Sequence, residues 1–66
     1  MAVLKVIEVL SNSKKSWEDA TEKAVEEASK TVKNIKSVYV QDQSAVVEDG
    51  KVKEYRVNLK LTFQVN

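Results

Sequence analysis

The chain has 66 residues with neither cysteine nor histidine, and its 11 basic and 10 acidic side chains leave a net charge of +1. This composition excludes disulfides and thiolate metal sites, removes the commonest general base, and lacks the basic excess expected of a nucleic-acid-binding face. The length allows one domain, residues 1–66, which is marginal as a lone monomer, so we expect a homo-oligomer. No apolar stretch resembles a membrane span or signal peptide, so we expect the protein to be cytoplasmic.

The first expected element is a strand from Val3 to Leu10. This segment is rich in β-branched residues, with Lys5 and Glu8 interrupting its apolar character. The polar stretch Ser11 to Lys15 follows and predicts a turn that ends the strand.

A helix is predicted next. Ser16 is a candidate N-cap with Asp19 three residues later, as in a capping box, and Ser13 is the alternative cap. Apolar residues then recur at spacings of three and four and predict one buried stripe, which contains Trp17, Ala20, Ala24, Ala28, Val32 and Ile35. Acidic residues in the first half of the segment and Lys30, Lys33 and Lys36 near its end suit the helix dipole. Pairs four apart, Asp19 with Lys23 and Glu26 with Lys30, would add support.

Two further strands complete the chain. Ser37 to Glu48 reads as a strand, and Asp49-Gly50 is a strong hairpin signal. The last segment alternates cleanly, with Tyr55, Val57, Leu59, Leu61, Phe63 and Val65 on one face and Glu54, Arg56, Asn58, Lys60, Thr62 and Gln64 on the other. The order predicts an α+β fold, β-α-β-β, with a three-stranded antiparallel sheet wrapped around one helix. The polar second face of the sheet would line a solvent cavity or meet another subunit.

The element order and several segments together resemble the dodecin family over nearly the whole chain. The matching segments are Val3 to Val9, Ser13 to Ala20, Ala24-Val25 with Ala28, Thr31-Val32 through Ile35, and Tyr55 to Phe63. The resemblance implies a homododecamer that forms a hollow shell of cubic symmetry. It also implies flavin bound in aromatic pockets at two-fold contacts, and a role in binding and buffering a small molecule without catalysis.

Two positions depart from the flavin-binding pattern of the family. Ser37 stands where the resemblance places a Trp that stacks on the flavin ring, and Arg56 stands where it places a Gln that hydrogen-bonds the flavin. Ser37 offers no π surface, so we expect FMN or riboflavin to bind weakly or not at all. Arg56 could still stack on a ring or hold a phosphate, and Tyr39 could stack in the pocket or pack against a neighbouring subunit. Trp17 is expected to be a core anchor.

A metal site is the other candidate. Asp42, Glu48 and Asp49 supply oxygen donors, which Ca²⁺ and Mg²⁺ prefer, and the resemblance implies acidic side chains around symmetry axes of a shell. The site is assigned to Asp42. No pair of side chains at a defined spacing suggests catalysis, and no Gly-rich phosphate loop is present. Two functions therefore stay open: a shell that stores a small ligand, and a flavin-free structural oligomer with a Ca²⁺ or Mg²⁺ site.

Overall fold

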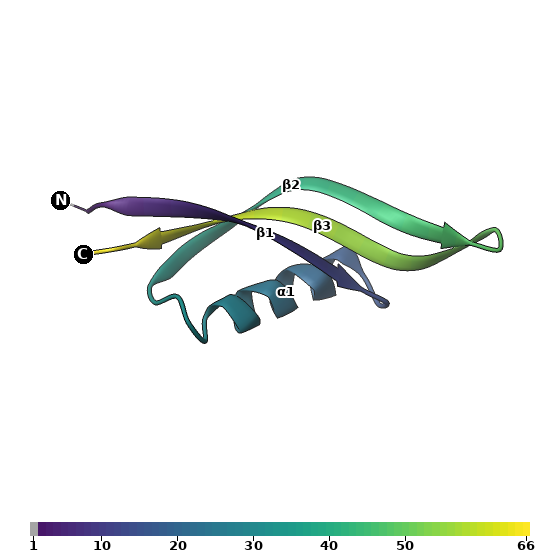
Figure 1. Ribbon diagram of the computed structural model, residues 1–66, viewed down its shortest axis with the longest axis horizontal. Helices are drawn as coiled ribbons and strands as arrows, with labels where there is room; N and C mark the ends of the chain where they lie inside the picture. Colours follow the sequence, from purple (N-terminus) through teal and green to yellow (C-terminus); the bar gives the residue numbers. More distant parts are fainter. Residues whose placement is uncertain (1) are drawn as a thin grey trace.

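Four elements in β-α-β-β order make up the chain in the computed structural model, which describes residues 2–66 (Figure 1). They are β1 (Leu4–Ser13), α1 (Trp17–Ala28), β2 (Ile35–Glu48) and β3 (Lys51–Gln64). The strands form one antiparallel sheet in the order β1-β3-β2, and α1 lies against one of its faces. The predicted α+β fold is confirmed.

The core lies between α1 and the central strand β3. Five apolar side chains are buried: Ala20, Ala24, Val57, Leu59 and Leu61. The two alanines bring the helix backbone close to the sheet, and Val9 and Trp17 pack around the edge of this cluster. Full burial of a leucine stabilises the fold by about 1.5–3 kcal/mol, so Leu59 and Leu61 carry much of this small core.

The helix begins where the capping pattern predicts. The Ser16 Oγ accepts a hydrogen bond from the backbone N–H of Asp19 at 2.9 Å, so Ser16 is the N-cap. Ser13, the alternative cap, has another role. Its buried hydroxyl donates to the Asp19 carboxylate at 2.6 Å and accepts from the N–H of Lys15 at 2.9 Å.

The helix ends earlier than the apolar spacing predicts. Its last residue is Ala28, so Val32 lies in the connection to the sheet and Ile35 begins β2. The helix has no basic residue in its last turn, and Lys30 pairs with Glu27 at 3.0 Å rather than with Glu26. Asn34 adopts a left-handed conformation, with φ of 61°, which turns the chain into β2 and is incompatible with a continuing helix.

The first strand is longer than its composition predicts. It continues through Ser13 because the polar residues at its end are satisfied by α1. The hydroxyl of Ser11 donates to the carbonyl of Ala20 at 2.9 Å, and Ser13 bonds to Asp19 as described above. The predicted turn at Ser11 to Lys15 is therefore shortened to the residues after Ser13.

The β2–β3 hairpin turns at Asp49-Gly50, as predicted. Both residues have positive φ, 53° and 73°, which is the requirement of a type I′ turn. The hairpin extends beyond the helix and gives the molecule its length, 51 × 20 × 13 Å (Figure 1). At the opposite end the two chain ends lie together, since the N–H of Val65 donates to the carbonyl of Val3 at 2.9 Å. Over residues 2–66, no helix is long and apolar enough to cross a membrane.

Candidate functional site

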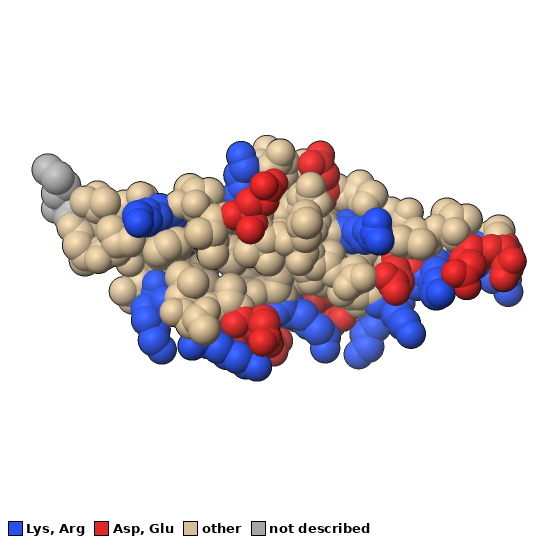
Figure 2. Space-filling model, in the orientation of Figure 1, with Lys and Arg blue, Asp and Glu red and all other residues tan. Residues whose placement is uncertain are grey.

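The face of the sheet opposite α1 is left uncovered by the protomer. On β1 it presents large apolar side chains that are more than half exposed, namely Leu4, Val6 and Leu10. On the central strand it presents polar ones, namely Arg56, Asn58, Lys60, Thr62 and Gln64. Figure 2 shows charges of both signs crowded at the hairpin end of the molecule and along the helix. We call the face of the sheet opposite α1 the uncovered face. The site residues predicted from the sequence lie on it.

The sheet register places all four predicted site residues on the uncovered face. Directly paired residues of antiparallel strands share a face, and the pairs with β3 are Ser37 with Thr62, Tyr39 with Lys60, Asp42 with Asn58, and Ser44 with Arg56. Asp42 joins this face only because a β-bulge lies between Val40 and Asp42. Strict alternation along Ser37 to Gln43 would have placed Asp42 on the opposite face.

The four residues do not converge on one point. Ser37 pairs with Thr62, six residues along β3 from Arg56, which corresponds to about 20 Å at the usual rise per residue. Asp42 and Arg56 lie in neighbouring rows of the sheet. One small ligand can therefore contact Asp42 and Arg56 of the same protomer, but Ser37 and Arg56 could meet in one pocket only if two protomers contribute.

Arg56 lies in an open groove of about 470 Å³ on this face. The groove is lined by Leu10, Ser11, Asn12, Ser44, Arg56, Val57 and Asn58. Of these residues, only Arg56 was predicted from the sequence to be a site residue. Arg56 pairs with Asn12 of β1 on one side and with Ser44 of β2 on the other. The three residues are seen to be neighbours only when the pairing of the strands is known.

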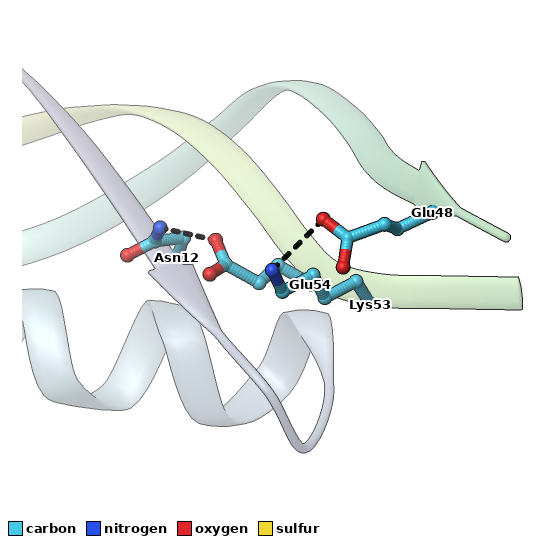
Figure 3. Close-up of polar contacts among 4 residues, drawn as sticks. All are labelled: Asn12, Glu48, Lys53 and Glu54. Carbon is cyan, nitrogen blue, oxygen red and sulfur yellow. Dashed lines mark hydrogen bonds and ion pairs between the residues drawn. The ribbon is translucent and has the colours of Figure 1, made fainter.

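Two amide side chains hold the carboxylates near the groove. The Asn12 Nδ2 donates to the Glu54 Oε2 at 2.7 Å (Figure 3). The Asn58 Nδ2 donates to the Asp42 Oδ2 at a long 3.5 Å. Residues 2–66 contain two ion pairs, Lys30–Glu27 and Lys53–Glu48, and neither involves Arg56.

The carboxylate of Asp42 is not part of an assembled metal site in the protomer. Across the part of the chain that the structure describes, no three acidic side chains lie close enough to hold an ion. Glu48, another of the predicted oxygen donors, is bound to Lys53 at 2.9 Å near the hairpin (Figure 3). A metal at Asp42 would therefore need ligands from neighbouring protomers.

Trp17 is a structural anchor, as expected. It packs against the core, and its ring stands edge-on to Tyr55 with centroids 4.9 Å apart. Its indole Nε1 also donates to the carbonyl oxygen of Ser44 at 2.9 Å. The helix is thereby tied to the strand that forms one wall of the groove.

Comparisons of the sequence and of the structure with known proteins point to the same family. The family model described as Dodecin matches residues 3–66. The calcium dodecin of Mycobacterium tuberculosis is 34% identical over 65 residues, which covers 98% of this chain and 92% of that protein. The solved dodecin from Streptomyces coelicolor superposes with a TM-score of 0.93 at 31% identity, over 98% of this chain and 93% of that one. The crystal structure of the M. tuberculosis calcium dodecin, described as having a novel calcium-binding site, gives a TM-score of 0.83 at 35% identity, with 97% and 91% covered.

Proposed function

Because the chain belongs to the dodecin family, we propose that it is a non-enzymatic protein whose twelve copies form a hollow shell that binds or buffers a small ligand. One observation carries this proposal: among the described residues, the protomer leaves more large apolar side chains exposed than it buries. Within residues 2–66, five apolar residues are buried, whereas ten large hydrophobic residues remain exposed. A single chain of this size with so small a core is stabilised most readily by association.

The uncovered face supports association through β1. Leu4, Val6 and Leu10 are 53%, 57% and 71% exposed and line one column of this face. Contiguous exposed apolar residues bordered by polar ones are typical of subunit contacts. Packing a second protomer against this column would also bring polar residues of β3 from two copies together around a shared pocket.

Flavin is proposed to bind this shell weakly or not at all. Ser37 is exposed on the uncovered face and has no ring to stack on an isoalloxazine. Tyr39 presents an aromatic side chain on the same face, 65% exposed, and is the residue that would supply stacking in the absence of a Trp.

A flavin-free oligomer that binds Ca²⁺ or Mg²⁺ is the second candidate function. The similarity to a calcium dodecin supports it, and Asp42 has a carboxylate whose described partner is the distant amide of Asn58. Ca²⁺ takes six to eight oxygen ligands. Since one protomer supplies a single carboxylate here, the proposed ion would lie where several copies of Asp42 meet.

Three measurements on the purified protein test these functions. Light scattering at micromolar concentration should give about 90 kDa, twelve times the 7.4 kDa of one chain. A monomeric or dimeric mass would reject the shell. Absorption titrations with riboflavin and FMN then test ligand binding, and tight binding of either would show that Ser37 does not impair the pocket. A melting temperature that rises with Ca²⁺ and falls with chelator, and that becomes insensitive in Asp42→Asn, would support the metal site.

A further inference from the structure

Arg56 is flanked by two carboxylates, and neither forms an ion pair with it. Glu54 lies two residues away on the same face of β3, but its carboxylate accepts a hydrogen bond from Asn12 at 2.7 Å (Figure 3). Asp42, in the neighbouring row of the sheet, accepts from Asn58. Neither of the two ion pairs within residues 2–66 includes Arg56. Within the described residues, the guanidinium therefore forms no salt bridge with its acidic neighbours.

The surroundings of Arg56 combine a charge with polar and apolar contacts. The same groove is lined by the polar residues Ser44, Asn12 and Asn58 and by Leu10, which is 71% exposed in the protomer. A guanidinium presents a planar fork of donors that matches a carboxylate or a phosphate in two parallel hydrogen bonds. Such a fork suits a molecule with an anionic end.

We propose that the groove around Arg56 binds a small organic anion, whose carboxylate or phosphate pairs with Arg56. Asn12 is a positioning residue in this site, because it holds the Glu54 carboxylate away from the guanidinium and leaves Arg56 free for the ligand. This inference rests on the proposed small-ligand function and specifies the chemical class of that ligand.

Matched pairs of probes test the anion contact directly. Dissociation constants are measured by calorimetry on the full-length protein for phenyl phosphate against phenol and for benzoate against benzamide, so the two pairs distinguish a phosphate from a carboxylate ligand. In at least one pair the anion should bind about tenfold more tightly than its neutral analogue, as a charge-assisted bidentate contact provides. This preference should shrink as salt is added, because the site is open to solvent.

Three variants separate the proposed contact from the general charge of the face. Arg56→Gln should abolish the preference for the anion. Lys60→Gln removes one positive charge from the same strand and face and should leave the preference intact. Asn12→Ala should weaken anion binding, since the released Glu54 carboxylate can then pair with Arg56, and adding Glu54→Gln to that variant should restore the affinity. A merely structural role of Asn12 would not be rescued by removing the charge of Glu54.

Equal affinities for anion and neutral analogue in both pairs would overturn the inference, as would equal losses in Arg56→Gln and Lys60→Gln. The groove is built from one chain, so the measurement is valid whatever mass light scattering gives. A twelve-subunit shell without anion preference would reject this inference alone. Anion preference in a protein of lower mass would reject the shell and retain the site.

Discussion

The indole nitrogen of Trp17 donates a hydrogen bond to the carbonyl oxygen of Ser44 across 2.9 Å and so joins the first turn of α1 to the edge strand β2. Ser44 also pairs with Arg56 and lines its groove. The same indole ring stands edge-on to Tyr55 on β3. Trp17 thus links the helix to two strands, at the level of the sheet where the candidate ligand would lie.

Substitutions of Trp17 should separate the contribution of its hydrogen bond to Ser44 from that of its ring packing. Trp17→Phe retains an aromatic ring against Tyr55 but loses the hydrogen bond to Ser44, so we predict a loss of about 0.5–1.5 kcal/mol in the free energy of unfolding. Trp17→Ala also loses the packing and should cost about 3 kcal/mol, the lower end of the usual range because the side chain is only half-buried. Denaturant unfolding at one fixed protomer concentration measures both, since association adds to apparent stability. Equal effects of the two substitutions would show that the hydrogen bond dominates.

A charge at Ala24 should prevent folding. Ala24 is 6% exposed against the sheet, and an aspartate there would be buried without a partner, so Ala24→Asp is predicted to yield no soluble assembled protein. Ala28 is only partly buried at the end of the helix, so Ala28→Asp should be milder. Glu26→Asp places the same side chain at an exposed helix position and serves as the control. Expression yield, circular dichroism and light scattering would report the three variants. A folded Ala24→Asp protein would contradict the packing of α1 described here.

The apolar column of β1 should be needed for assembly. Leu10→Lys puts a charge on a residue that is 71% exposed in the protomer, so it leaves the protomer core intact while placing an ammonium in the proposed subunit contact. We predict a smaller mass by light scattering and a lower melting temperature, because folding and assembly are linked by mass action. Glu22→Gln, on an exposed position of α1, changes the net charge by the same +1 and serves as the control. A Leu10→Lys protein of unchanged mass would show that this column is not an interface.

Restoring the family's flavin contacts should restore flavin binding. Ser37→Trp with Arg56→Gln returns an aromatic surface and an amide, and the added apolar burial, at about 25 cal/mol per Å², allows a gain of a few kcal/mol. Because the two positions lie about 20 Å apart within one sheet, binding should appear only in the assembled protein. Riboflavin fluorescence quenching with and without dissociating conditions measures this. An assembled double variant that still fails to bind would mean that other pocket walls have diverged.

The helix illustrates how far the sequence could predict the fold. Its start was predictable because the Ser16 cap and Asp19 form a local pattern, and the hydrogen bond between them is present. The end of the helix was not predictable from the sequence. Val32 and Ile35 continue the helical spacing of apolar residues, but apolar residues at these positions are equally suited to a connection that folds back onto the sheet. The left-handed Asn34 decides between these outcomes, and asparagine is only one of several residues that adopt this conformation.

The candidate site was less predictable than the fold. Alternation from Ser37 would place Asp42 on the helix-facing side, whereas the bulge after Val40 returns it to the face that carries Arg56. A bulge adds one residue without a distinctive sequence pattern. Asn12 was likewise missed, because it lies in a segment that reads as a turn and its neighbourhood with Arg56 depends on pairing between distant strands.

The meeting of the two chain ends has a consequence for how the protein folds. Val3 and Asn66, 63 positions apart in sequence, are joined by a hydrogen bond of 2.9 Å. The pairs of β1 with β3 run from Ser13 with Tyr55 to Leu4 with Gln64, so each pair joins residues far apart in the sequence. Closing so long a loop delays folding. A circular permutant opened at Asp49-Gly50, with a short linker between the present ends, would turn the β1–β3 pair into a local hairpin. The permuted chain would retain the same sheet while shifting the slow step of folding to the pairing of β2.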